Sequence, residues 1–326
     1  MKLVEFKRVK KYFPIQRGFL ESIFTKETTF VKAVDNVSFT IDRGEVLGLV
    51  GESGSGKTTI GRLCVRLIRP TEGQILYDGS DIADIRGKEL RMMRRRLQFT
   101  FQDPTSSLSP RMTIGNAISD ALRLQGIGTQ EEMKARTDEI LERVGLSPAS
   151  TFYNRLPHQL SGGQKQRVVF ARATILNPEF VVTDEPVAMV DVSIKAQILE
   201  LMMDLKKEYD LTYLFITHDL ATARHVCDRI AVMYLGRIAE IADRHQIYED
   251  PLHPYSVGLM RAIPVPDPKT KRAEAILEGE IPSPIDPPSG CRFHPRCPKA
   301  FDRCPKEEPE LVDVGDGRQV ACHLYS

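Results

Sequence analysis

The feature that most constrains the fold of this chain is a glycine-rich loop that follows a run of apolar residues. The loop reads Gly51-Glu52-Ser53-Gly54-Ser55-Gly56-Lys57-Thr58 and matches the pattern G-x-x-x-x-G-K-[ST]. The apolar run 46–50 is typical of a buried parallel strand, and the stretch 58–67 favours a helix. A strand, an anion-binding loop and a helix in this order predict an α/β fold built on a parallel sheet.

The composition of this loop predicts binding of a nucleoside triphosphate. Glycines let consecutive backbone N–H groups curl around phosphate oxygens, and the following helix points its positive end at the same anion. Lys57 would contribute its charge to the β- and γ-phosphates, and the hydroxyl of Thr58 can bind Mg²⁺. We therefore expect ATP and Mg²⁺ here, with the nucleotide held by Gly51, Ser53, Gly54, Ser55, Gly56, Lys57, Thr58 and Thr59.

A second apolar run ends in two carboxylates. Residues 180–183 are followed by Asp184 and Glu185. A strand that ends in this way places Asp184 beside the Mg²⁺, and Glu185 could orient and deprotonate an attacking water. Together with the loop, the pair indicates hydrolysis of the nucleotide.

The rest of the chain alternates between strand and helix patterns. Residues 3–50 are β-rich and 114–145 have helical spacing, and further buried strands are expected at 180–182, 213–216 and 230–233. After about residue 245 the composition changes: residues 251–298 are rich in proline, and four of the six cysteines lie beyond residue 290. This region is expected to form a small C-terminal appendage without long helices.

Charge and hydropathy exclude several classes of protein. The 45 Lys and Arg nearly equal the 44 Asp and Glu, so no overall field favours a nucleic acid partner or an acidic membrane. The run Arg94-Arg95-Arg96 is read as a solvated helix face. No apolar stretch approaches the roughly 20 residues that span a bilayer, and no signal core follows Met1. We expect a cytoplasmic protein whose membrane role, if any, comes through partner subunits.

A third motif carries a family resemblance. Leu160-Ser161-Gly162-Gly163-Gln164-Lys165-Gln166-Arg167 resembles the signature sequence of ABC ATPases. It is a second anion site, with a Ser hydroxyl and Gly amides at a helix N-terminus. In that family two ATPase subunits face head to tail, and the signature of one closes on the γ-phosphate held by the other. The resemblance implies that Ser161, Gly162, Gly163 and Gln164 contact the ATP of a partner subunit.

Other segments resemble the remaining motifs of this family. Gln102 lies in a Q-loop-like segment and would reach Mg²⁺ and the water, while His218 matches the histidine that bonds the γ-phosphate. Lys10-Lys11-Tyr12-Phe13 resembles the adenine-stacking loop, with Phe13 favoured over Tyr12. Core packing of either ring is the alternative. The implied catalytic residues are Glu185, His218 and Gln102, with Thr58, Gln102 and Asp184 around Mg²⁺.

One segment departs from the family pattern. The D-loop, usually Ser-Ala-Leu-Asp, reads Ala188-Met189-Val190-Asp191 here, so a hydroxyl near the attacking water is missing. The departure leaves open whether both ATP sites are equally active. A mainly regulatory ATP-binding subunit is one alternative, against which the intact Glu185 argues. A soluble ABC ATPase of DNA repair or translation is another, but the chain shows neither a long coiled coil nor a second cassette.

Several segments resemble one subfamily, the ATPases of oligopeptide, dipeptide and nickel importers. They are residues 102–112, 191–193 with 196–197, 232–236 and 253–255, and the long insertion at 14–31 favours the "F" member of the paired subunits. The resemblance implies a peripheral subunit on the cytoplasmic face of the membrane. It would work as a heterodimer with a second ATPase beneath two transmembrane permease subunits, supplied indirectly by an extracytoplasmic substrate-binding protein. Peptides are the expected cargo, with oligosaccharides and nickel as alternatives.

The cysteines beyond residue 290 form a possible ligand set. Some members of this subfamily hold a [4Fe–4S] cluster at a quartet such as Cys291, Cys297, Cys304 and Cys322. Zinc, disulfides and no ligand are the alternatives; zinc sites usually have closer Cys-x₂-Cys pairs, and a reducing compartment disfavours disulfides. Cys64 and Cys227 are predicted to be buried apolar residues, and His294 and His323 to lie at the surface.

The expected architecture combines these elements. Residues 1–245 would form the ABC ATPase domain, a P-loop α/β core with a helical subdomain inserted at about 103–165. Residues 246–326 would form the C-terminal extension that carries the cysteine quartet.

Overall fold

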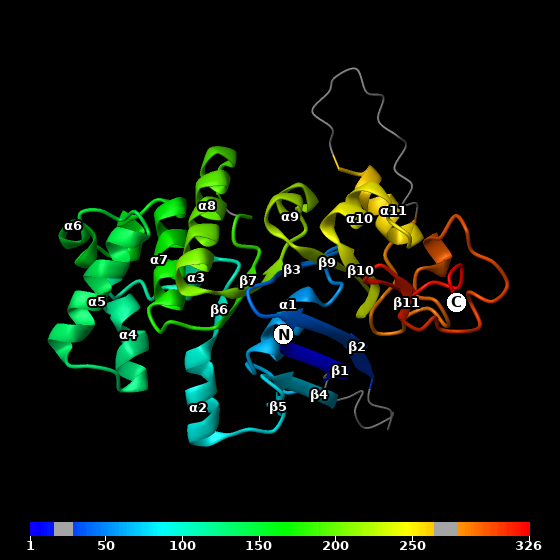
Figure 1. Ribbon diagram of the computed structural model, residues 1–326, viewed down its shortest axis with the longest axis horizontal. Coiled ribbons are helices and arrows are strands. Elements are labelled where there is room, and N and C mark those ends of the chain that lie inside the picture. The colour runs from blue at the N-terminus through cyan, green and yellow to red at the C-terminus, as the bar shows by residue number, and fades with distance from the viewer. Residues whose placement is uncertain (16–28, 189, 264–278) are drawn as a thin grey trace, which may run out of the picture.

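The computed structural model describes residues 1–15, 29–188, 190–263 and 279–326. Within these residues the strands form two sheets, one of eight strands in the order β11-β12-β10-β9-β3-β8-β7-β6 and one of four in the order β2-β1-β4-β5. Figure 1 shows helices covering the larger sheet, with a helical group at one end and the C-terminal region at the other. The α/β core with a helical subdomain is confirmed.

Five neighbouring strands of the larger sheet are parallel and carry the site. They are β9 (Arg229–Tyr234), β3 (Val46–Val50), β8 (Thr212–Ile216), β7 (Phe180–Asp184) and β6 (Leu97–Thr100). Every residue of β3, β7 and β8 is buried, as the apolar runs predicted. Because parallel strands end at the same sheet edge, the loops that follow β3, β7 and β8 lie close together.

The smaller sheet is antiparallel and packs over the first helix. It comprises β1 (Lys2–Pro14), β2 (Phe30–Asp42), β4 (Glu72–Tyr77) and β5 (Ser80–Asp81). Helix α1 (Lys57–Cys64) buries Ile60 and Leu63 in a core shared with both sheets. This helix ends three residues before the predicted stretch 58–67 does, because the chain turns at Arg66, whose φ is 54°.

Helix α2 (Gly87–Arg96) leads into β6, and a group of helices follows β6. It contains α3 (Pro104–Ser107), α4 (Ile114–Gln125), α5 (Gln130–Arg143), α6 (Ala149–Tyr153) and the 3₁₀ turn η2 (Pro157–Gln159). A capping box begins α5, where Thr129 and Glu132 each accept a hydrogen bond from the other residue's backbone N–H. These helices lie within the range predicted for the helical subdomain.

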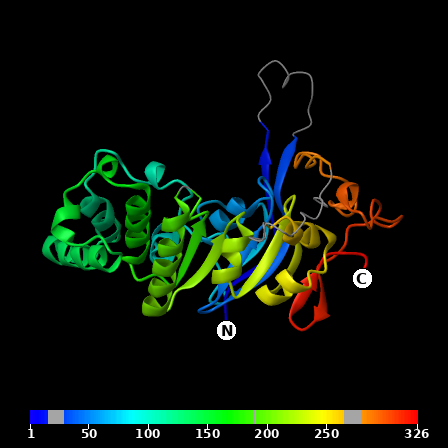
Figure 2. The same cartoon turned by 90° about the horizontal axis from the view of Figure 1, so that it is seen from above.

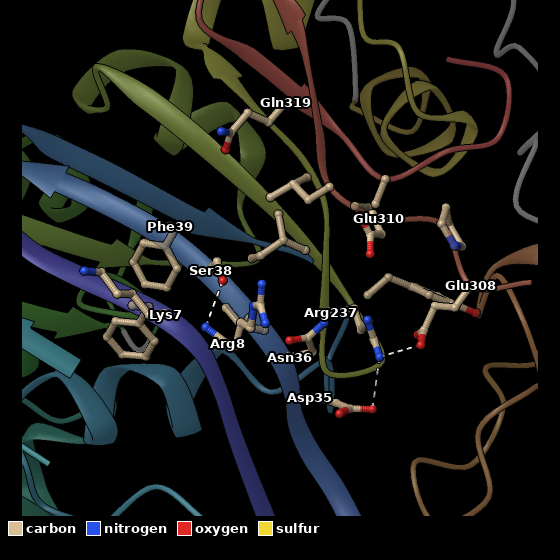
Figure 3. Close-up of a pocket in the computed structure, with 18 of the residues that line it drawn as sticks. Lys7, Arg8, Asp35, Asn36, Ser38, Phe39, Arg237, Glu308, Glu310 and Gln319 are labelled. Atoms are coloured by element: carbon tan, nitrogen blue, oxygen red, sulfur yellow. Dashed lines mark hydrogen bonds and ion pairs between the residues drawn. The ribbon is translucent and has the colours of Figure 1, made fainter. Parts of the chain in front are cut away.

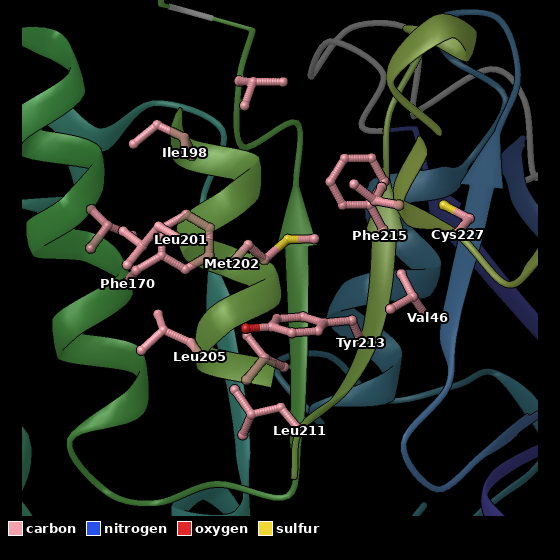
Figure 4. Close-up of a cluster of buried hydrophobic side chains, with 14 of the residues drawn as sticks. Val46, Phe170, Ile198, Leu201, Met202, Leu205, Leu211, Tyr213, Phe215 and Cys227 are labelled. Carbon is pink, nitrogen blue, oxygen red and sulfur yellow. The ribbon is translucent and has the colours of Figure 1, made fainter. Parts of the chain in front are cut away.

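Two longer helices connect this group to the sheet. In α7 (Gly162–Thr174) and α8 (Val192–Tyr209), apolar side chains face β8, where Tyr213 and Phe215 are fully buried. Figure 4 shows Phe170, Leu201, Met202 and Leu205 packed around these rings. Each fully buried side chain of this size contributes about 1.5–3 kcal/mol. The packing fixes α7, and with it the signature motif, against the sheet.

The C-terminal region joins the larger sheet instead of standing apart. After β10 (Arg237–Asp243) come the helices α10 (Arg244–Glu249) and α11 (Pro254–Arg261). The turn η3 (His294–Arg296) and the hairpin of β11 (Val312–Gly315) and β12 (Arg318–Val320) follow. Strand β12 pairs with β10, with Glu240 opposite Val320. The helices are short, as the proline content predicted, and the proposed domain limit at 245 falls inside α10.

The burial of several cysteines and histidines can be compared with the predictions. Cys64 and Cys227, which follows α9 (Leu220–Val226), are buried as predicted. The surface prediction for His323 is wrong: it is 8% exposed, because its Nε2 contacts the Glu307 backbone oxygen and its ring lies against Phe301. His294 is half-buried. Most of the insertion 14–31, and Met189 of the D-loop, lie outside the described residues. No helix among the described residues has the length and apolar character needed to cross a membrane.

Candidate functional site

The phosphate loop, residues 51–58, connects β3 to α1 and presses against two other strands. Gly51 has a φ of 148° and Gly56 a φ of 104°. A Cβ at Gly51 would lie 2.1 Å from the Met233 backbone oxygen, and one at Gly56 would lie 2.1 Å from that of Ala33. Both positions therefore require glycine for conformation and for space.

Lys57 lies inside the loop. Its Nζ donates hydrogen bonds to the backbone oxygens of Gly51 (2.8 Å) and Glu52 (2.9 Å). Burial lowers the pKa of this ammonium group, although the carboxylates of Glu185 and Asp184 act in the opposite direction. A desolvated cation held by backbone oxygens inside this loop suits a polyanionic ligand.

The hydroxyl of Thr58 meets the carboxylate at the end of β7. Thr58 Oγ1 donates to Asp184 Oδ1 at 3.2 Å. Burial, and to a lesser extent the neighbouring Glu185, raise the pKa of Asp184. A hydroxyl and a buried carboxylate in contact are oxygen ligands of the kind that Mg²⁺ takes, and a divalent cation there would favour the ionised acid.

Glu185 lies between two side chains from other loops. Gln102 Nε2 donates to Glu185 Oε2 at 2.6 Å, and His218 Nδ1 lies 2.9 Å from Glu185 Oε1. The His218 side chain is 60% exposed, whereas that of Glu185 is 16% exposed. The φ of Glu185 is 48°, a strained value for this residue type and one common at functional sites. Three sequence-predicted catalytic residues are thus brought together beside Asp184.

The signature residues lie elsewhere. Ser161 caps α7, where its hydroxyl accepts from Gln164 N and the Gln164 side chain accepts from Ser161 N. Ser161 and Gly162 are exposed. Figure 1 shows α7 in the helical part of the molecule, away from α1 and the phosphate loop. The structure thus forms a capped, exposed helix N-terminus that lies apart from this chain's own phosphate loop.

The adenine-loop candidates lie at the end of β1. Tyr12 donates its hydroxyl hydrogen to Asp35 Oδ1 at 2.6 Å. Phe13 is 37% exposed, with Lys11 Nζ 5.0 Å from the centre of its ring. Of the two rings, that of Phe13 is free to stack on a base, which agrees with the preference for Phe13 over Tyr12 and leaves its role a prediction.

Sequence reasoning missed a residue that contacts the phosphate loop. Arg296, from the C-terminal region, donates from Nη1 to Glu52 Oε2 at 2.8 Å and from Nη2 to Glu52 Oε1 at 3.1 Å. On the same loop, Glu52 N donates to the hydroxyl of Tyr255 at 3.0 Å. The residues are about 200 or more positions apart, so no local spacing could have indicated the pairing.

The four C-terminal cysteines line one small pocket with aromatic and histidine side chains. All four are free thiols, and Cys291 N donates to the Cys304 backbone oxygen at 2.8 Å. Burial raises the pKa of Cys291 to about 11 and also raises those of Cys297 and Cys322. Four soft donors suit an iron–sulfur cluster or zinc. In the described ranges, however, no three His, Cys, Asp or Glu side chains form a group that could hold a metal ion as they stand.

Comparisons with known families match both parts of the chain. The model of the ABC transporter family matches residues 34–188, and that of the oligopeptide/dipeptide transporter C-terminal region matches residues 239–304. The chain is 47% identical to the oligopeptide transport ATP-binding protein AppF of Bacillus subtilis, covering 99% of this chain and 98% of the relative. It is 53% identical to a peptide import ATP-binding protein of Brucella ovis, covering 94% and 96%.

Solved structures agree with this fold. The ATP-binding cassette MJ0796, in a dimeric post-hydrolysis state with ADP and Pi, is 31% identical with a TM-score of 0.64. The match covers 74% of this chain and 99% of that one. About a quarter of the present chain therefore has no counterpart in MJ0796.

Proposed function

Since the chain belongs to the ATP-binding proteins of oligopeptide and dipeptide ABC transporters, we propose that it hydrolyses ATP to drive the import of peptides across a cell membrane. The observation that carries this proposal is the convergence of Lys57, Thr58, Asp184 and Glu185 at one edge of the parallel sheet. One basic group, one hydroxyl and two carboxylates are the parts that phosphoryl transfer to water requires.

Each residue has a role in the proposed reaction. Lys57 and the loop amides would hold the β- and γ-phosphates. Thr58, Gln102 and Asp184 would hold Mg²⁺, whose charge would offset that of the phosphate oxygens. Glu185 accepts a proton from water as the water oxygen bonds to the γ-phosphorus. The bond from that phosphorus to the bridging oxygen breaks, and ADP and phosphate leave. His218 contacts the γ-phosphate and, through the 2.9 Å contact, orients Glu185.

The exposed signature motif supports a partner. A capped helix end with an exposed serine, distant from the chain's own phosphate loop, would close on the γ-phosphate of a second ATPase subunit. We propose a heterodimer in which ATP lies between the two subunits. It would sit beneath two permease subunits at the cytoplasmic face of the membrane, with an extracytoplasmic binding protein supplying the cargo.

For the cysteine quartet we propose a [4Fe–4S] cluster with a structural role. The support is the donor set: four free thiols from separate turns around one pocket. The thiols would have to turn inward and lose their protons, and a bound cluster favours both changes. Nothing in ATP-driven transport requires electrons.

Transport in proteoliposomes tests the main proposal. The two permease subunits, this chain and its partner ATPase are reconstituted with the cognate binding protein outside and ATP inside. Uptake of labelled oligopeptide that ceases with Lys57→Ala supports the proposal. Uptake of an oligosaccharide or of nickel, with none of peptide, overturns the assignment of cargo but not that of the ATPase. Full peptide uptake with Lys57→Ala overturns the ATPase role of this subunit.

A further inference from the structure

Two arginines beside the quartet cysteines reach opposite ends of the nucleotide site. Arg296 precedes Cys297 and pairs with Glu52 of the phosphate loop, while Arg292 follows Cys291 and pairs with Asp35 on β2. The two guanidinium groups are four positions apart in the sequence. Each is 8% exposed, so neither is an ordinary surface ion pair.

The contact between Arg296 and Glu52 is bidentate and enclosed. Two parallel N–H···O bonds of 2.8 and 3.1 Å join the groups, and Arg296 Nη1 also lies 3.3 Å from the Tyr234 hydroxyl. The hydrogen bond to Glu52 is the main reason that the pKa of Arg296 is raised. Planar bidentate pairs restrict orientation as well as distance. The pair therefore fixes the second residue of the phosphate loop in one position.

Aromatic packing gives this pair a rigid base. The Phe293 ring lies 5.3 Å from the rings of Tyr234 and Tyr255, whose own ring centres are 4.7 Å apart. Tyr255, at the start of α11, also accepts the hydrogen bond of Glu52 N. Two side chains of the C-terminal region thus hold Glu52, Arg296 at its carboxylate and Tyr255 at its backbone N–H.

Arg292 acts at the adenine end. Its guanidinium donates to Asp35 Oδ2 and to the Leu235 backbone oxygen, and Asp35 accepts the Tyr12 hydroxyl at 2.6 Å on its other oxygen. Tyr12 is the residue before Phe13, the proposed adenine-stacking ring. Arg292 therefore determines the position of β1 at this point through one carboxylate.

The same carboxylate lies at the edge of the large groove between the smaller sheet and the C-terminal region. Figure 3 shows Arg237 between Asp35 and Glu308, and the two contacts are 3.5 and 2.5 Å. None of the phosphate-loop residues lines this groove. A backbone path connects the two ends as well, since Asp35 N donates to Gly236 O, and Gly236 N donates to Ser55 O.

We propose that Arg296 and Arg292 are positioning residues for ATP binding, Arg296 through Glu52 for the phosphates and Arg292 through Asp35 and Tyr12 for the base. This inference rests on the proposed function. It makes the C-terminal region part of the nucleotide site rather than a separate appendage. Replacing one partner leaves a charge buried without its counterpart, so the loop must rearrange.

Binding measurements on the purified full chain test the two halves separately. Calorimetry gives the Kd of ATP and, by competition, that of inorganic tripolyphosphate, which has no base. Arg296→Ala should weaken the binding of both ligands by about tenfold, which is in the range of ordinary coupling between sites. Arg292→Ala and Tyr12→Phe should raise the Kd of ATP but leave the Kd of tripolyphosphate unchanged. Arg303→Ala is the matched control, because Arg303 belongs to the same region but pairs with Glu307 at the surface.

A double-mutant cycle separates positioning from loss of fold. If Arg296 acts through Glu52, then Glu52→Gln combined with Arg296→Ala should bind ATP no more weakly than the worse single variant. Additive losses, or wild-type Kd values in both arginine variants, would overturn the proposal. Equal weakening of every variant including Arg303→Ala would also overturn it, by showing a general loss of structure. A wild-type chain that binds no ATP would instead refute the proposed function.

Discussion

His218 Nδ1 lies 2.9 Å from Glu185 Oε1, although 33 residues separate the two in the sequence. The contact joins the ends of two neighbouring parallel strands, β7 and β8. An imidazole that is 60% exposed can move onto a ligand, while the less exposed carboxylate stays with Gln102. The arrangement places the proposed base between two exposed polar side chains, the Gln102 amide and the His218 ring.

Glu185→Gln should bind ATP with unchanged affinity and lose its turnover. General-base assistance is worth about 10²–10⁴-fold, and the amide keeps the shape of the carboxylate but cannot accept the proton. The phosphate-release rate of the assembled transporter measures this. Glu131→Gln, an exposed change in the first turn of α5, is the control. Turnover near that of the wild type in Glu185→Gln would show that another group is the base.

Ser161→Arg should impair hydrolysis at the partner's site while nucleotide binding by this chain persists. The substitution removes the cap of α7 and places a bulky side chain where the γ-phosphate of the partner is expected. Turnover of the heterodimer and the ATP Kd of the isolated chain are compared. The control is Asn116→Arg, a change at an exposed position of α4. An isolated chain that hydrolyses ATP at the rate of the full transporter would contradict the composite site.

Cys297→Ser should abolish iron binding without preventing ATP binding. Anaerobically purified wild-type protein is expected to be brown, with about four irons per chain if the quartet holds one cluster. The variant should be colourless and more rapidly cleaved after about residue 285, because the pocket loses one of its four ligands. Cys64→Ala, in α1, is the control. One zinc per chain, or four freely alkylated thiols without metal, would refute the cluster.

Glu179→Gln should lower the melting temperature near neutral pH but have little effect in strong acid. Hydrogen bonds from Arg96, and then from Arg43 and Tyr77, outweigh burial and lower the pKa of Glu179 to about 2. A carboxyl whose pKa is lower in the folded state stabilises the fold above its unfolded value of 4.5, and this stabilisation is lost as the pH falls toward 2. Melting curves of the two proteins between pH 7 and pH 2, at about one-unit steps, should therefore converge. A constant difference would show that the carboxylate acts through shape alone.

The sequence predicted those parts of the site that are encoded by short spacing. The phosphate loop, the pair Asp184 and Glu185, and the buried strands β3, β7 and β8 each need only a few consecutive residues. Gln102 and His218 were predicted only from the family resemblance. The structure brings them to Glu185 because the strands that precede them end on a common edge of the sheet.

The missed features depend on contacts between distant segments. Arg296 pairs with Glu52 across 244 positions. The surface prediction for His323 failed because its ring lies against Phe301 and contacts the Glu307 backbone oxygen. No motif or local spacing in the sequence indicates either contact. The length of α1 was also overestimated, since periodicity does not indicate the left-handed turn at Arg66.

The pairing of β12 with β10 has a consequence for handling the protein. Without the last ten residues, β10 would present unpaired N–H and C=O groups around Glu240 and Ile241, in the middle of a strand that is mostly buried and apolar. Such an open edge recruits strands from other molecules. The present edge is β11, four residues long and exposed, with Asp313 in it and a turn at Asp316. The hairpin therefore covers an edge that would otherwise promote self-association. A truncation that removes only this hairpin should yield insoluble protein, although every proposed ATP-binding residue remains.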